Sequence, residues 1–120
     1  MQLGKTLALL AEGILWRMTH QPWLGRRLIE GLGESDENAR SVAGIMLAKS
    51  GSAAIPILHD ALTERHHVAE VLAVLGDVGD ASTHDEVARF ASDKDEKIAR
   101  AARDALRVLA LRKSAGERSR

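Results

Sequence analysis

Apolar residues recur along this chain every three to four positions, with charged residues between them. This spacing matches the 3.6-residue turn of an α-helix rather than the two-residue alternation of a β-strand. Gly and Pro residues interrupt the pattern at short intervals and divide it into seven predicted helices. These helices cover approximately residues 3–18, 22–32, 35–50, 53–62, 66–76, 83–91 and 93–109.

Several residue types mark the expected ends of these helices. Pro22 suits the first turn of the second helix, and Gly51 is expected to stop the third. Residues 76–80 have the composition of a turn. Thr83, with Glu86 three residues later, has the pattern of a capping box and is expected to start the sixth helix.

The first helix is apolar on more than one side. One stripe is predicted to face the core and consists of Leu3, Leu7, Leu10, Ile14 and Met18. Leu9 and Trp16, seven residues apart, share another face. We expect residues 1–21 to cap the N-terminal end, with Trp16 and Trp23 packing around the first turn. The alternative is a homodimer or partner surface formed by Leu9 and Trp16.

The chain contains a weak internal repeat. Residues 39–43, 68–72 and 98–102 each open a helix that ends in an aliphatic stretch, and they are spaced by 29 and then 30 residues. The following helices also correspond, because Leu28 and Leu32 lie 30 residues before Leu58 and Leu62. A period near 30 with paired helices is typical of helical repeat proteins.

The repeat is similar to the short HEAT-like repeat of the phycobilisome-lyase type. Residues 35–40 and 93–100 resemble its acidic turn and helix start, residues 75–77 resemble its Leu-Gly helix end, and residues 65–67 depart from it. The resemblance covers residues 22–110. It implies an all-α fold, a short α-solenoid of about three and a half HEAT-like helix pairs. We therefore expect one domain over residues 1–112 and a flexible polar tail over 113–120.

The resemblance also implies a binding surface, because the second helix of each pair usually lines the concave side of such a solenoid. The outward residues expected there are Arg26, Arg27, Glu30, His59, Asp60, Asp85, Glu86 and Arg89. This set is mixed in charge and suits a protein or peptide partner better than a phosphate backbone. The expected function is therefore a non-enzymatic scaffold or adaptor.

Composition narrows the possibilities further. The chain has 120 residues, of which 45% are hydrophobic and 2% aromatic, so the core of its single domain must be aliphatic. The absence of Cys excludes disulfides, thiol nucleophiles and thiolate metal sites. Charges interrupt the first 18 residues, so neither a signal peptide nor a membrane span is expected, and the prediction is a soluble, cytoplasmic protein.

The charge balance speaks against a dedicated nucleic-acid binder, because 17 Lys and Arg residues offset 17 Asp and Glu residues. Nucleic-acid binding stays open as an alternative function. It would use Arg26, Arg27 and the basic C-terminal residues Arg107, Arg112, Lys113, Arg118 and Arg120.

Histidines offer the main candidate chemistry. Adjacent helical residues point about 100° apart, so His66 and His67 are not expected to share a metal. His59-Asp60 and His84-Asp85 recur in successive second helices, where stacking would bring them close, and a minor enzymatic or cofactor-carrying role there is a third alternative. No serine lies in a nucleophile elbow, and no Gly-rich phosphate loop follows a strand. No catalytic activity, cofactor or metal is expected.

Overall fold

Seven α-helices and two 3₁₀ turns make up the part of the chain that the computed structural model describes, residues 3–19 and 21–118. The prediction of an all-α protein with seven helices is confirmed. The side chains of Leu3, Ala81 and residues 116–118 also lie outside the described part, as do Met1, Gln2, His20, Ser119 and Arg120. The expected inward position of Leu3 and the expected contributions of Arg118 and Arg120 therefore fall outside it.

The helices are α1 (Leu3–Thr19), α2 (Pro22–Gly31), α3 (Glu37–Lys49), α4 (Ile55–Thr63), α5 (Val68–Val78), α6 (Ala81–Arg89) and α7 (Glu96–Arg118), with 3₁₀ turns η1 (Gly51–Ala54) and η2 (Phe90–Ser92).

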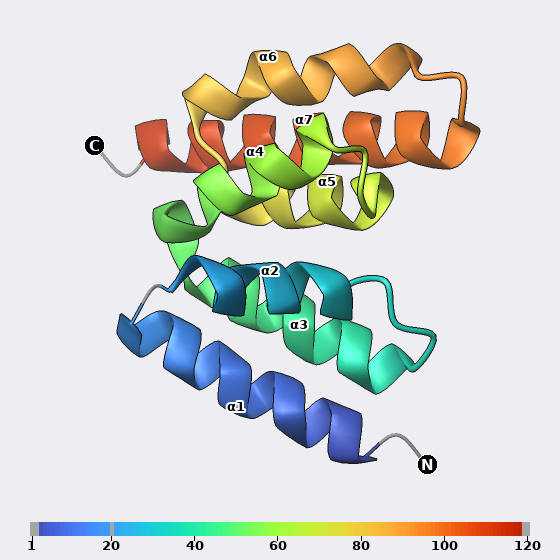
Figure 1. The fold of residues 1–120 in the computed structure, drawn as a ribbon. Helices are drawn as coiled ribbons and strands as arrows, with labels where there is room; N and C mark the ends of the chain where they lie inside the picture. The colour runs from blue at the N-terminus through green and yellow to red at the C-terminus, as the bar shows by residue number, and fades with distance from the viewer. Residues whose placement is uncertain (1–2, 20, 119–120) are drawn as a thin grey trace.

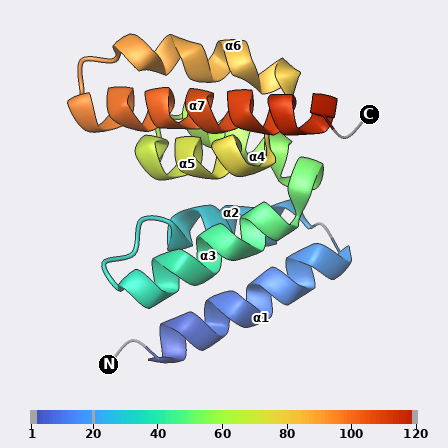
Figure 2. The same cartoon turned by 180° about the vertical axis from the view of Figure 1, so that it is seen from behind.

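The helices form two layers (Figure 1). α2, α4 and α6 follow one another along one side of the molecule, and α3, α5 and α7 lie behind them. α1 closes one end of the back layer, where it packs against α2 and α3 (Figure 2). The principal extents are 39 × 38 × 23 Å, so the molecule is a thick slab.

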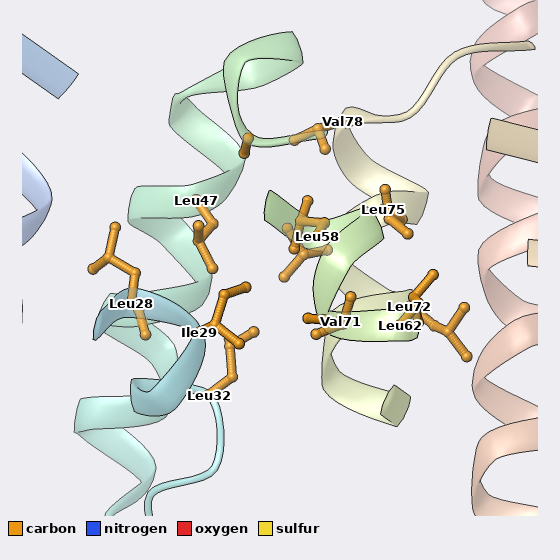
Figure 3. Packing of buried hydrophobic residues seen from close by; sticks show 14 of the residues in the cluster. Leu28, Ile29, Leu32, Leu47, Leu58, Leu62, Val71, Leu72, Leu75 and Val78 are labelled. Atoms are coloured by element: carbon orange, nitrogen blue, oxygen red, sulfur yellow. The ribbon is translucent and has the colours of Figure 1, made fainter. Parts of the chain in front are cut away.

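Apart from Trp16, the buried residues of the core are aliphatic, as composition predicts, and the core runs between the layers (Figure 3). Leu28 and Leu32 from the α2 end of the slab and Leu58 and Leu62 from α4 are all buried, which confirms that these equivalent positions face inward. Val71, with other apolar residues of α5, packs between them and the rest of the core. Each fully buried aliphatic side chain of this kind stabilises the fold by about 1.5–3 kcal/mol relative to exposure.

α6 begins earlier than its sequence pattern indicates. Asp80 is the N-cap, and its carboxylate accepts hydrogen bonds from the Ser82 hydroxyl and from the Ser82 backbone N–H at 2.9 Å, which together lower the pKa of Asp80. Thr83 lies inside the helix and donates to the Asp80 carbonyl at 2.8 Å, so the predicted capping box of Thr83 and Glu86 is wrong. The expected turn over residues 76–80 is also shorter, because α5 continues to Val78.

Two further boundaries differ from the prediction. α5 begins at Val68 rather than near residue 66, because Arg65 and His67 adopt left-handed backbone conformations with φ of 53° and 49°. α7 continues to Arg118, so residues 113–118 are helical where a polar tail is expected.

The predicted inward face of α1 is wrong. Trp16 is only 2% exposed and Leu9 is also buried, whereas Leu7, Ile14 and Met18 are exposed, Met18 by 75%. Leu10 of the predicted stripe is exposed as well. Both faces of α1 are apolar, so periodicity alone did not identify the one that packs.

Two glycines explain which face of α1 packs against the core. A Cβ at Gly13 would lie 2.8 Å from the Met46 sulfur, and one at Gly31 would lie 2.8 Å from Leu9 Cδ2, so small residues let α1 approach α3 and α2 closely. The burial of Leu9 excludes the dimer surface expected of Leu9 and Trp16. Trp23 is 54% exposed, so the expected packing of Trp16 and Trp23 around the first turn is also wrong; the Trp16 ring lies against Gly25 instead.

The most extensive contact between two helices joins α5 to α7. A Cβ at Gly76 would lie 3.1 Å from Ala105 Cα, which shows how closely the two backbones approach. Arg112 of α7 donates to the carbonyls of Gly76 and Gly79 at 3.4 and 2.6 Å. It thereby satisfies acceptors at the C-terminal end of α5 that the helix leaves open.

Candidate functional site

A polar face extends over the layer formed by α2, α4 and α6. Seven of the eight residues predicted for partner binding line two pockets on it. We use the term polar face for these seven residues: Arg26, Glu30, His59, Asp60, Asp85, Glu86 and Arg89. Asp60 lines both pockets, so the two hollows adjoin one another.

The first pocket lies between α2 and α4 and has a volume of about 150 Å³. Arg26 and Glu30 line it from α2, and Asp60 lines it from α4. Glu64 and His66, which follow α4, complete its polar wall. Arg26 makes no ion pair with another described residue, so its guanidinium is available to a ligand.

The second pocket lies between α4 and α6 and has a volume of about 450 Å³. Glu86 is its least exposed charged side chain, at 13%. The Glu86 carboxylate contacts His59 Nδ1 from α4 and lies 3.9 Å from the Arg89 guanidinium. These contacts tie α4 to α6 and leave Asp60 and Asp85 at the edge of the pocket.

Arg27 is the predicted site residue that the structure places elsewhere. Its guanidinium donates to both carboxylate oxygens of Glu12 on α1, at 3.0 and 3.1 Å. The hydrogen bond and the charge of Glu12 raise the pKa of Arg27. The residue therefore joins α2 to α1 and lines neither pocket of the polar face.

Without Arg27 the polar face is acidic. Its two arginines, Arg26 and Arg89, stand against the carboxylates of Glu30, Asp60, Asp85 and Glu86. The predicted surface of mixed charge is therefore an acidic surface with one arginine toward each end. Such a surface attracts cations and repels phosphates.

The two His-Asp pairs come together only in part. His59, Asp60 and Asp85 line the α4–α6 pocket, whereas His84 lines a hollow between α6 and α7 and lies 3.2 Å from Asp85. Two hydroxyls also line the α4–α6 pocket, those of Ser82 and Thr83, and both donate to Asp80. Both hydroxyls thus bond to the N-cap residue of α6, and neither is held by a histidine as an activated nucleophile would be.

A second group of residues comes together that sequence reasoning did not find. Glu30, His66 and His67 place one potential ligand atom each within 4.8 Å of one another. Adjacent residues of a helix would not share a metal, but His66 and His67 both precede α5 and neither is helical. One feature of the sequence could have indicated this group: residues 65–67 depart from the acidic turn of the repeat.

An apolar face covers the outside of α1. Every exposed residue from Thr6 to Trp16 is apolar, and Met18 extends the surface by a turn. We use the term apolar face for the large side chains of this surface: Leu7, Leu10, Ile14, Leu15 and Met18. Two charged residues at its margins pair with other parts of the chain, Lys5 with Glu34 of the α2–α3 link at 2.9 Å and Glu12 with Arg27 of α2, and a third, Arg17, is exposed.

Comparison with protein-family models, with curated proteins and with solved structures finds no match for this chain. No single helix in the described residues has both the length and the apolar composition of a membrane span; α3 and the segment Gly51–Thr63 meet both criteria only as a pair bent by 115°.

Proposed function

We propose that this chain is a non-enzymatic protein-interaction module, built as a short HEAT-like stack of helix pairs. The pairs α2–α3, α4–α5 and α6–α7 follow one another along the slab, in keeping with the 29- to 30-residue repeat. On this proposal the polar face is the concave side of the stack. Stacked helix pairs commonly serve as rigid binding surfaces.

The apolar face of α1 is the observation that carries the proposal. Terminal helices of a repeat array need a polar outer side to stay soluble alone, and the outer side of α1 is apolar along its length. Contiguous exposed apolar patches on soluble proteins mark interaction surfaces. The partner must therefore present an apolar, helix-sized surface.

A second copy of the chain fits this surface. Small exposed residues, Ala8 and Ala11, lie beside the larger Leu7, Leu10 and Ile14 on the same side of α1. In a two-fold arrangement the large residues of each copy meet the small residues of the other, which is how ridges pack into grooves. No like charges are opposed, because the exposed residues between Lys5 and Arg17 carry none. We infer a homodimer through the first helix, with these residues in place of Leu9 and Trp16.

Sedimentation velocity of the parent chain and of a Leu7→Glu/Ile14→Glu variant tests the dimer. We expect the parent to dimerise and the variant to weaken the dimer by roughly 30-fold or more, because each copy would bury two carboxylates in an apolar contact. The matched control is Leu111→Glu, which adds a carboxylate at a 64% exposed Leu of α7. A parent that is monomeric at 100 μM (on the order of the weakest stable dimers), or a control as weak as the variant, would overturn the proposal.

The polar face supports a second partner, a polypeptide rich in Lys and Arg. Its carboxylates surround two adjoining pockets of about 150 and 450 Å³, which accommodate side chains of a bound segment. Fluorescence anisotropy with a Lys/Arg-rich peptide and an acidic peptide of equal length separates the possibilities. We expect binding of the basic peptide only, and its loss in Asp60→Lys/Asp85→Lys. Asp104→Lys on α7 is the matched control, and equal loss there would contradict a specific surface.

Nucleic-acid binding has less support. Arg27 is held by Glu12, Arg112 by the carbonyls at the end of α5, and Arg107 lies 3.4 Å from Asp104. Arg26 remains, within an acidic surface, and so does the exposed Lys113 near the end of α7. Titration of duplex DNA and of RNA at 50 and 200 mM salt (roughly the range over which phosphate contacts weaken) tests this alternative. Binding at low salt that weakens steeply as the salt concentration rises would support it.

A further inference from the structure

Glu30 of α2 lies close to the imidazoles of two histidines in the link between α4 and α5. His66 Nε2 contacts Glu30 Oε1, and His67 Nε2 lies 3.9 Å from Glu30 Oε2. The two histidine rings are 4.2 Å apart between centroids and inclined by 47°. The three ligand atoms therefore surround one point between α2 and the link.

The backbone of the link is shaped to present both rings. Arg65 and His67 are the two described non-glycine residues with positive φ, and they flank His66. Left-handed conformations at such residues are uncommon and carry a conformational cost. They turn successive imidazoles to the same side, which a helix would not do.

Gly33 provides the space for the second ring. A Cβ at this position would lie 2.5 Å from His67 Nδ1, so any larger residue would displace the imidazole. The ring thus lies over bare backbone just after α2, with its Nε2 toward Glu30. His66 is held independently, since its backbone N–H donates to the Ala61 carbonyl at 2.8 Å.

We propose that Glu30, His66 and His67 form a binding site for a divalent transition-metal ion of the Zn²⁺ type. Two imidazoles and one carboxylate are a ligand set that such ions accept, and in tetrahedral zinc sites the ligand atoms lie about 3.3 Å apart. The present separations, up to 4.8 Å, reach that value by small rotations of the exposed Glu30 side chain and of the partly exposed imidazoles. Mg²⁺ and Ca²⁺ prefer all-oxygen sites and are not expected to compete.

The site leaves a fourth position open. The adjoining pocket of about 150 Å³ is lined by Glu30 and His66 together with Asp60 and Glu64. A water molecule, or a side chain of a polypeptide on the polar face, can complete the coordination from there. The ion would also link α2 to the α4–α5 connection. It would therefore bind the folded chain in preference to the unfolded one.

Calorimetric titration of Zn²⁺ into the full chain, freed of metal by chelation, tests the site. We expect one ion per chain and an affinity that falls at least about tenfold in Glu30→Gln, His66→Ala and His67→Ala, since even outer partners of a metal site contribute that much. His59→Ala and His84→Ala are matched controls that should bind as the parent does. Circular dichroism verifies that every variant folds.

Two further measurements distinguish a built site from chance chelation. Gly33→Ala keeps all three ligands but displaces the His67 ring, so its affinity should fall as well. Co²⁺ should give visible absorption bands in the parent that His67→Ala loses. Absence of Zn²⁺ binding in the parent, or equal losses in the His59 and His84 controls, would overturn the proposal, as would full affinity in Gly33→Ala.

Discussion

The first and last helices, α1 and α7, differ in the kind of surface that they expose to solvent. Each packs one face on the core and has its other face in solvent. The exposed residues of α1 between Lys5 and Arg17 are apolar, whereas α7 exposes charged residues that pair among themselves, Arg103 with Glu96 at 2.8 Å and Arg107 with Asp104 at 3.4 Å. The α7 end of the slab thus presents a charged surface to solvent, whereas the α1 end presents an apolar one.

This difference shows why periodicity identifies a helix more readily than it identifies its buried face. In α7 the inward residues, among them Ala102, Ala105 and Leu109, are the apolar ones, so pattern and packing agree. In α1 the apolar residues exceed what one face can hold, and the backbone approach permitted by Gly13 and Gly31 decides which of them are buried.

The largest expected effect tests the orientation of α1. Trp16→Ala removes a buried ring and should reduce the free energy of unfolding by about 3–5 kcal/mol. Met18→Ala, two residues away on the outer face, should change it by less than about 0.5 kcal/mol in monomeric protein. Urea unfolding measures both. Similar losses in the two variants would mean that α1 is rotated from the orientation described.

The next effect concerns the close approach of α7. Gly76→Ala places a methyl group 3.1 Å from Ala105 Cα and should destabilise the fold by ~1–3 kcal/mol. Gly44→Ala in α3 is the matched control, since its Cβ would lie 3.7 Å from Leu32 and the change should stabilise α3 by roughly 0.5–1 kcal/mol. Chemical denaturation gives both values, and a stabilising Gly76→Ala would contradict the tight contact of α5 with α7.

A smaller effect is expected where α7 caps α5. Arg112→Ala removes the hydrogen bonds to the Gly76 and Gly79 carbonyls and should cost about 1 kcal/mol. Arg107→Ala, on the same helix, breaks only an exposed pair with Asp104 and should cost at most about 0.5 kcal/mol. Thermal unfolding followed by circular dichroism compares them, and the reverse ranking would show that Arg112 does not cap α5.

The smallest effect depends on pH and lies in the turn that precedes α7. Arg65 hydrogen-bonds Asp93 at 3.1 Å and, with the Asp95 backbone N–H, lowers the pKa of Asp93 below its ordinary 3.8. A lowered folded-state pKa stabilises the fold above pH 3.8, and this contribution is lost as the pH falls through the folded value. Asp93→Asn should therefore be less stable than the parent at pH 6 (about two units above that value), with the difference vanishing in acid. A difference that stays constant across an acid titration would contradict this.

Much of the fold follows from local pattern. The number of helices and the inward positions of Leu28, Leu32, Leu58 and Leu62 were predictable, because 3.6-residue periodicity with one apolar face has a single packing solution. The start of α6 was missed because Asp80 and Thr83 are both competent caps, and sequence does not rank them.

The candidate surfaces were less predictable, since they depend on contacts between helices. Most of the polar face was foreseen from residues that point outward from α2, α4 and α6. The pairing of Arg27 was not predictable in this way, because its partner, Glu12, belongs to α1. The grouping of His66 and His67 was missed because two left-handed residues in one link have no pattern in the amino-acid sequence.

Three charged contacts between segments that lie near one another in the sequence have a consequence for the rate of folding. Lys5–Glu34, Arg65–Asp93 and Glu70–Lys97 join residues 29, 28 and 27 positions apart. Closing chain segments of this length loses little more entropy than closing much shorter ones. Each helix pair can thus gain its contacts before distant parts of the chain are ordered, and we expect refolding in microseconds to milliseconds, as in helical bundles of low contact order.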